Sequence, residues 1–186
     1  AGVQIFEQSA VHHIQEGRQA VLQTDGGRVT ADHVVLACNG YLGGLNRKVA
    51  ARVMPINNFI AATEPLGDRI KDVLPQDVAV ADSRFVVNYF RLSHDRRLLF
   101  GGAAKVRAPM SVVFPQLKDV RIDYAWGGTL AITLKRLPYL ARLSPNILSA
   151  SGYSGHGVGT ATHAGQLMAR AIQGDGDGFD LMSTIP

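Results

Sequence analysis

The stretch from Ile147 to Ile172 decides the fold, and it reads ILSAS, then GYSGHGVG, then TATHAGQLMARAI. Ile147–Ser151 predicts a strand, and Gly152–Gly159 predicts a glycine-rich loop. Small and apolar residues then recur at helical spacing from Val158 to Ile172, which predicts a helix that ends at Gly174. This order exposes backbone N–H groups at the positive end of a helix, a place that suits an anion or a developing negative charge.

Small residues leave one side of this helix start almost bare. Without side chains at Gly157 and Gly159, a flat ring or another backbone could approach closely. Tight packing between helix and sheet would use the same residues, so both interpretations stay open. The run Gly152–His156 lacks the last glycine of a G-x-S-x-G nucleophile elbow, and no third glycine completes a G-x-G-x-x-G fingerprint. Neither a serine hydrolase nor a complete dinucleotide fingerprint is therefore indicated.

A second strand is predicted near the start of the chain. Val34–Cys38 contains five consecutive apolar residues, as in a parallel strand that is buried on both faces, and it ends at Asn39 and Gly40. Before it, Gln19–Thr24 and Arg28–Thr30 flank a glycine-containing turn and predict a hairpin. Val3–Phe6 predicts one more short strand.

The middle of the chain predicts an antiparallel sheet. Arg52–Glu64 is extended, Phe85–Arg91 alternates so that Tyr89 and Arg91 share a face, and Leu98–Gly102 returns after a polar turn. Residues 115–126 predict a helix, and residues 175–186 a frayed tail. The fold class is therefore α+β: an α/β part from residues 1–50 and 146–186, and an antiparallel-sheet domain from residues 51–145.

Composition narrows the classes of function. Nineteen basic and fifteen acidic residues give a net charge of +4, but the basic residues are scattered, so we expect no nucleic-acid binding. No apolar stretch is long enough to span a membrane, and the N-terminus does not resemble a signal peptide. Cys38 is the single cysteine and the histidines are dispersed, so we expect no metal site and a cytoplasmic location.

Three blocks of sequence resemble the D-amino-acid oxidase-like FAD-dependent oxidoreductases. Residues 31–41 (ADHVVLACNGY) are similar to the strand that closes the family's FAD domain, and residues 89–102 to a hairpin beside the substrate. The third block joins Trp126-Gly127-Gly128, Leu137-Pro138-Tyr139 and the loop Gly152–Gly159, which resembles the loop that meets the flavin ring. The string from Gly152 to Ile172 is most similar to gamma-glutamylputrescine oxidoreductases, with glycine and sarcosine oxidases in the same family.

The resemblance implies FAD as cofactor and oxidation of the C–N bond of an amine or amino acid by hydride transfer to the flavin. Its implied cofactor contacts are Val11 beside adenine, then Ala37, Cys38, Gly40, Gly155, His156, Gly157, Val158 and Gly159. His156 would also neighbour the reaction or bind substrate, unless it only orients the loop. Cys38 could instead be a buried, inert thiol.

Tyr89 and Arg91 are the implied substrate-binding residues, with the tyrosine as a pocket wall and the arginine for a carboxylate. A core tyrosine and an exposed arginine are the alternative. Tyr153 and Trp126 are further candidates for the pocket wall, where core packing would also account for the tryptophan.

The family's N-terminal phosphate-binding fingerprint does not occur in this sequence. We therefore expect a C-terminal fragment that starts inside a fold, binds FAD poorly by itself and needs the N-terminal half of the same protein as partner. The other expected partner is a small amine or amino-acid substrate. Two further interpretations are a flavin dehydrogenase that uses an acceptor other than oxygen and a non-catalytic interaction domain with an FAD fold.

Overall fold

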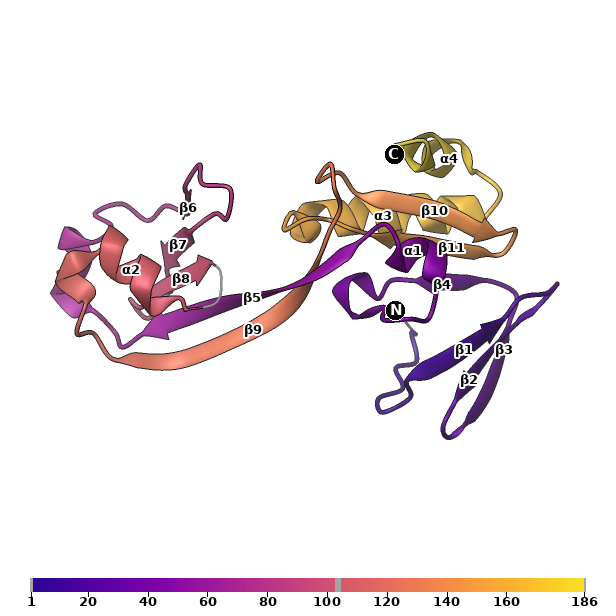
Figure 1. The fold of residues 1–186 in the computed structure, drawn as a ribbon, viewed down its shortest axis with the longest axis horizontal. Helices are drawn as coiled ribbons and strands as arrows, with labels where there is room; N and C mark the ends of the chain where they lie inside the picture. The colour runs from indigo at the N-terminus through magenta and orange to yellow at the C-terminus, as the bar shows by residue number, and fades with distance from the viewer. Residues whose placement is uncertain (1, 103–104, 186) are drawn as a thin grey trace. The chain divides into compact units, whose positions relative to one another are not determined.

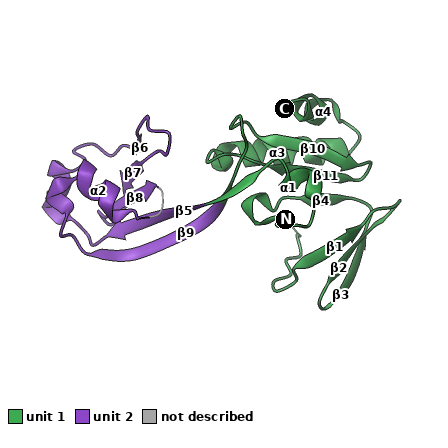
Figure 2. Ribbon diagram, in the orientation of Figure 1, with its two compact units in different colours: residues 1–56, 130–186 green, residues 57–129 purple. Residues whose placement is uncertain are grey.

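The chain has an α+β fold whose computed structural model describes residues 2–102 and 105–185. It divides into two compact units, Ala1–Ile56 with Leu130–Pro186, and Asn57–Thr129 (Figure 2). The strands β5 (Met54–Thr63) and β9 (Ile122–Ile132) carry the chain from one unit to the other. No helix in the described part of the chain is long and apolar enough to cross a membrane.

The first unit is organised around a three-stranded sheet in the order β10-β11-β4 (Figure 1). β11 (Ile147–Ser151) is buried along its whole length, pairs antiparallel with β10 (Tyr139–Ser144) and parallel with β4 (Val34–Leu36). The strand predicted at Ile147–Ser151 is therefore confirmed, and the strand predicted at Val34–Cys38 is parallel as expected but ends at Leu36. β4 differs in burial from the prediction, because Val34 and Leu36 are buried while Val35 is 41% exposed.

The helix α3 (Gly157–Ile172) follows β11, as the sequence predicts. Ala164, Leu167 and Met168 face a cluster that includes Leu140 and Leu148 of the sheet. The rest of the helix surface is mostly exposed. Packing against this sheet thus uses only one side of α3.

A separate three-stranded meander precedes β4 and contains β1 (Val11–Gln15), β2 (Ala20–Thr24) and β3 (Gly27–Ala31). The hairpin of β2 and β3 confirms the prediction from its glycine-containing turn. The strand predicted at Val3–Phe6 was wrong, since these residues form no regular structure and β1 begins at Val11. The short elements that follow β4 are a 3-10 helix, η1 (Asn39–Tyr41), and α1 (Arg47–Ala50), which Asn46 caps.

The second unit contains a five-stranded sheet in the order β6-β7-β8-β5-β9. Its additional strands are β6 (Val80–Ala81), β7 (Tyr89–Leu92) and β8 (Leu98–Gly102). One face of the sheet packs against α2 (Arg107–Val113) and two 3-10 helices, η2 (Gly67–Asp72) and η3 (Pro115–Leu117). β7 begins at Tyr89 and not at Phe85 as predicted, because Asp82 binds both the backbone N–H and the side-chain amide of Asn88.

The helix predicted over residues 115–126 was wrong. α2 ends at Val113, and its C-cap Phe114 precedes Pro115 and has φ −125° and ψ 75°, outside the helical region that a residue before proline disfavours. Leu117 and Val120 are buried in the core from a turn, and the chain is already in β9 at Ile122. Their spacing therefore reflects a shared core and not helical periodicity.

The predicted frayed tail is instead a helix, α4 (Asp177–Ser183). Phe179 is fully buried against the cluster of α3 and β10. The guanidinium of Arg142 lies 5.5 Å from the ring centroid of Phe179 and 2.9 Å from the carboxylate of Asp180. These contacts hold the last helix on the first unit.

We expect Phe179→Ala to lower the free energy of unfolding by about 3–5 kcal/mol, because it leaves a cavity in the core. Leu181→Ala in the same helix is the control; Leu181 is 71% exposed, so its removal should cost less than about 0.5 kcal/mol. Urea denaturation of both variants measures the difference. If both variants lose the same free energy of unfolding, Phe179 is not the residue that holds α4 on the first unit.

Arg97 links three parts of the second unit. Its guanidinium bonds to the carboxylates of Asp95 and Asp123 and to the carbonyl of Thr63. Hydrogen bonds lower the pKa of both carboxyls, from Arg97 for Asp123 and from Ser93 and then Arg97 for Asp95. Both acids therefore favour the folded state in their ionised form.

Because these carboxyl pKa values are lower in the folded state, their contribution is present at neutral pH and is lost as pH falls below about 4. We expect the midpoint of thermal unfolding to fall less steeply between about pH 5 and pH 3 in Asp123→Asn than in the unsubstituted protein. Asp68→Asn, at an exposed position, is the control and should retain the full slope. Identical slopes in all three proteins would contradict the expectation.

Candidate functional site: a glycine-rich loop at the sheet edge

The two parallel strands of the first unit end at the same edge of their sheet. η1 follows β4 there, and the glycine-rich loop follows β11. The carboxyl ends of parallel strands are the usual place for a ligand in an open α/β sheet. The predicted cofactor residues Ala37, Cys38 and Gly40 and the loop Gly155–Gly159 thus come to one region, although more than 100 residues separate them in sequence.

One hydrogen bond joins the two loops. The side-chain oxygen of Asn39 accepts the backbone N–H of Gly152 at 3.2 Å. Asn39 has φ 46°, a left-handed conformation that asparagine tolerates better than most residues. The loop after β4 is thereby held to the first residue of the loop after β11.

Ser154 fixes the centre of the glycine-rich loop. It adopts φ 53°, and its hydroxyl accepts the N–H of Thr133 at 3.2 Å and donates to the carbonyl of Gly152 at 3.1 Å. Its own N–H donates to Ala131 at 3.0 Å. A buried serine in a strained conformation with this many partners is typical of a loop that must keep one shape.

The loop then opens to the surface where α3 begins. His156 is the first residue outside the helix, its N–H donates to the carbonyl of Tyr153 at 2.9 Å, and its imidazole does not cap the helix. The first N–H groups of any helix have no intrahelical acceptor, so those of Gly157, Val158 and Gly159 are available at the positive helix end. Added Cβ atoms at Gly155 and Gly159 would meet nothing within 4 Å, and Val158 is 96% exposed.

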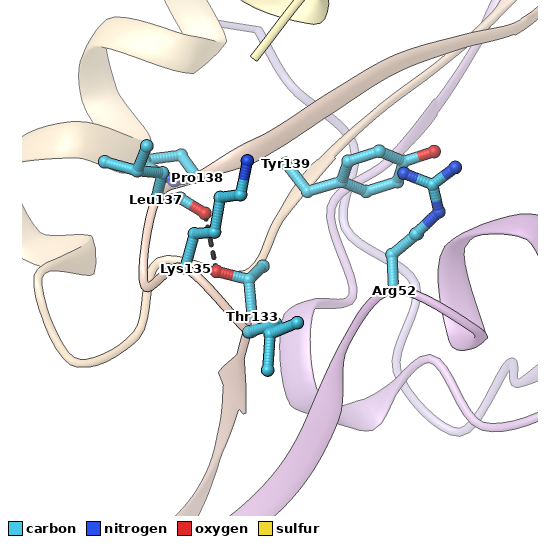
Figure 3. Close-up of a pocket in the computed structure, with 7 residues that line it drawn as sticks. Arg52, Thr133, Lys135, Leu137, Pro138 and Tyr139 are labelled. Carbon is cyan, nitrogen blue, oxygen red and sulfur yellow. Dashed lines mark hydrogen bonds between the residues drawn. The ribbon is translucent and has the colours of Figure 1, made fainter. Parts of the chain in front are cut away.

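A cavity of about 160 Å³ adjoins the loop. Its lining residues come from the turn after α1 and from the segment that leads from β9 into β10: Arg52, Thr133, Leu134, Lys135, Leu137, Pro138 and Tyr139. Figure 3 labels all of these except Leu134. The guanidinium of Arg52 lies 5.6 Å from the ring centroid of Tyr139, and the hydroxyl of Thr133 donates to the carbonyl of Leu137 at 2.7 Å. The bond from Thr133 to Ser154 makes the cavity and the loop one site.

Four residues of this cavity had no signal in the sequence: Arg52, Thr133, Leu134 and Lys135. They lie on two segments that are far apart in sequence, and none belongs to a recognisable motif. Only the neighbouring Leu137-Pro138-Tyr139 carried a signal, through the family resemblance.

Cys38 and Val11 differ in their surroundings. Cys38 is half-buried beside the cluster of Val34, Leu36 and Ile147, and burial raises the pKa of its thiol. Val11 lies in the separate meander, paired with Thr24. The described contacts place Cys38 near the sheet edge but give Val11 no direct contact with it.

Tyr89 and Arg91 lie on β7 of the second unit, on the sheet face opposite the helices. Their neighbour Phe90 packs into the core with Phe100 and Phe114. The hydroxyl of Tyr89 donates to Asn58, while Arg91 is exposed with its Nε bonded to the carbonyl of Leu92. The predicted shared face of the two residues is confirmed.

The remaining candidates for the pocket wall have different environments. Tyr153 is buried in the cluster between β11 and α3, and burial raises its pKa. Trp126 is 47% exposed on β9 and lines a second cavity of about 450 Å³ in the second unit, together with Phe59 and Val106. Among the described residues, no group of three or more His, Cys, Asp or Glu could hold a metal ion.

The chain belongs to the FAD dependent oxidoreductase family, which its sequence matches over residues 1–171. It is 40% identical to gamma-glutamylputrescine oxidoreductase of Escherichia coli over 200 residues, covering 100% of this chain and 47% of that protein. It is 39% identical over 198 residues to the probable oxidoreductase OrdL of Rhizobium meliloti, with coverage of 100% and 46%. A more distant relative is glycine oxidase of Bacillus subtilis, at 26% identity over 92% of this chain and 49% of that protein.

The fold also occurs in solved flavoenzyme structures. L-proline dehydrogenase from P. horikoshii matches with a TM-score of 0.72 at 20% identity, over 92% of this chain and 51% of that one. Glycine oxidase from Bacillus cereus matches with a TM-score of 0.72 at 18% identity, over 93% and 51%. This chain therefore spans about half the length of the relatives that it matches.

We expect Gly152→Ala to destabilise the first unit strongly. Gly152 has φ 71°, and an added Cβ would lie 2.4 Å from Cγ2 of Thr133, so strain and a clash combine to an expected loss of about 2–4 kcal/mol. Gly159→Ala is the matched control, since its Cβ would enter open space in a helix and should be neutral or stabilising. Chemical denaturation measures both, and a harmless Gly152→Ala would contradict the proposed rigidity of the loop.

Proposed function

We propose that this chain supplies the flavin-ring side and the substrate-binding sheet of an enzyme that oxidises the C–N bond of an amine or amino acid. Residues 1–50 and 146–186 belong to the cofactor-binding part in this proposal, and residues 51–145 include the substrate-binding sheet. The observation that carries it is the open, glycine-rich start of α3, a helix whose later turns pack on the sheet through Ala164, Leu167 and Met168.

The chemistry of this site fits a flavin ring. Gly155 and Gly159 leave room for a planar group, and the N–H groups of Gly157, Val158 and Gly159 offer hydrogen-bond donors with the helix dipole behind them. The neighbouring cavity adds an aromatic ring and two cationic side chains, Arg52 and Lys135. When bound, FAD supplies the acceptor for the hydride that leaves the carbon bearing the amine.

With FAD bound, the backbone N–H groups at the start of α3 would offer hydrogen bonds to negative charge on the flavin ring, as an oxyanion hole does for its anion. His156, the residue before α3, would either contact the substrate or orient the loop. On the sheet of the second unit, Arg91 offers its terminal N–H groups to a carboxylate, and Tyr89 contributes a wall of the amine pocket.

The N-terminal half of the family's proteins is the proposed partner of this chain. β4 is the outer strand of its sheet among the described residues, and Val35 on this strand is partly exposed. The chain spans about half of its curated relatives, and its sequence contains no phosphate-binding fingerprint. We infer that the phosphates of FAD are bound by the other half and that this chain alone binds FAD weakly.

The test is to express the chain together with an N-terminal half and to record a visible spectrum. The proposal requires flavin absorption near ~450 nm that candidate amines bleach under anaerobic conditions. Glycine and gamma-glutamylputrescine are the first substrates to try, because two relatives are named for them. A protein without flavin would overturn the proposal, and oxygen consumption would separate an oxidase from a dehydrogenase that uses another acceptor.

Within that protein, we expect Gly159→Ala to weaken FAD binding by at least about tenfold, because the methyl group would fill the space in front of the N–H donors. Gly26→Ala, in the turn between β2 and β3, also meets nothing within 4 Å and should bind FAD normally. Titration of the flavin-free proteins with FAD gives both dissociation constants. If the two variants bind FAD equally well, the flavin ring does not lie against α3.

A further inference from the structure

A chain of hydrogen bonds crosses the open face of the second sheet. The side-chain nitrogen of Asn58, on β5, donates to the backbone carbonyl of Gly102, on β8, at 3.0 Å. The hydroxyl of Tyr89, on β7, donates to the side-chain oxygen of Asn58 at 2.5 Å. Asn58 therefore sits between a backbone group and the tyrosine.

The direction of this chain is fixed by its first member. A carbonyl oxygen such as that of Gly102 can only accept, so the NH₂ group of Asn58 must face it. The amide oxygen of Asn58 then faces Tyr89 and can also only accept. The single proton of the tyrosine hydroxyl is thus committed to Asn58, and the hydroxyl oxygen keeps only acceptor capacity for any other group.

The ring of Tyr89 is also held in place. A Cβ at Gly101, the residue opposite Tyr89 on β8, would lie 2.1 Å from Cζ of the ring, so the ring rests directly on the glycine backbone. Burial raises the pKa of Tyr89, so the hydroxyl keeps its proton at neutral pH. The position of the Tyr89 ring and the protonation of its hydroxyl are therefore both fixed before a ligand binds.

Arg91, two residues further along β7, presents the opposite hydrogen-bonding character. Its Nε donates to the carbonyl of Leu92 at 3.1 Å, and the side chain is exposed on the same face as Tyr89. A guanidinium offers donors only. The same sheet face therefore carries an acceptor, the Tyr89 hydroxyl, whose ring reaches over Gly101 of β8 towards β5, and a set of donors on Arg91 of β7.

We propose that Asn58 is a positioning residue that makes the Tyr89 hydroxyl an obligate acceptor, so that this position receives an N–H donor of the substrate's amino group. This inference rests on the proposed function and deepens it, because it assigns the amine end of the substrate to Tyr89 and an acceptor end to Arg91. The alternative is that Asn58 only ties three strands together. That role would affect stability without affecting the choice of ligand.

Two ligands of similar shape distinguish these roles. N-methylglycine and methoxyacetate both carry a carboxylate. At the other end N-methylglycine has an NH₂⁺ donor, whereas methoxyacetate has an ether oxygen that can only accept. The test uses the flavin-containing protein assembled from this chain and its N-terminal half, and measures KM for a ligand that is oxidised or Ki for one that is not. The unsubstituted protein should bind N-methylglycine more tightly.

Tyr89→Phe keeps the ring on Gly101 and removes the hydroxyl. It should weaken the binding of N-methylglycine by roughly tenfold, as for a lost hydrogen bond to a charged group, and leave the binding of methoxyacetate unchanged. Asn58→Leu frees the Tyr89 hydroxyl to donate as well as to accept, so it should strengthen the binding of methoxyacetate and reduce the preference for N-methylglycine. Asn57→Leu removes the amide one position earlier on β5, which bonds to Thr129, and should change neither ligand's preference.

The proposal is overturned if Tyr89→Phe weakens both ligands equally or neither, or if the unsubstituted, flavin-containing protein binds neither ligand. Tyr89→Phe retains the packing of the ring and gives a result even if Asn58→Leu does not fold. An assembled protein that lacks flavin would contradict the proposed function itself. A protein with normal flavin absorption that does not discriminate between the two ligands would contradict only the role proposed for Asn58.

Discussion

The parallel pairing of β4 and β11 is the constraint on which the candidate site depends. It brings together two segments that flank the whole second unit, and the bond from Gly152 to Asn39 spans 113 residues. Parallel strands end at the same edge, so the loops after both strands must share it. Without this pairing, Cys38 and Gly40 would have no reason to lie near the glycine-rich loop.

The pairing also allows the loop to be strained. Asn39 and Ser154 both adopt left-handed conformations that cost free energy, and Gly152 adopts one that a side chain could not share with Thr133. The hydrogen bonds of Ser154 and the full burial of β11 offset that cost. A loop stabilised in this way keeps its donors in position before a ligand binds, which lowers the cost of binding.

Sequence patterns predicted the elements whose signal is local. β11, the glycine-rich loop and α3 follow directly from strand composition and helical spacing, and the β2–β3 hairpin follows from its turn. The helix expected over residues 115–126 failed because Leu117 and Val120 share a core by way of a turn, and Pro115 ends the real helix. α4 was missed because Phe179 and Met182 lie in a glycine-rich, acidic segment whose composition masks a short amphipathic helix.

The residues of the candidate site likewise divide into those with a local signal in the sequence and those without one. The loop and the face shared by Tyr89 and Arg91 were visible in sequence because spacing places them. Arg52, Thr133 and Asn58 were not, because each acquires its role from a partner far away in the chain. Gly101 had no signal either, since only the register of β7 and β8 shows that the ring of Tyr89 covers it.

The donors of the loop differ from those of a charged side chain in one further respect. Backbone N–H groups and a helix dipole do not titrate, so their attraction for a negative charge is the same at every pH where the fold persists. On the proposed function, the stabilisation of an anion therefore belongs to the backbone and stays constant over the pH range in which the fold persists.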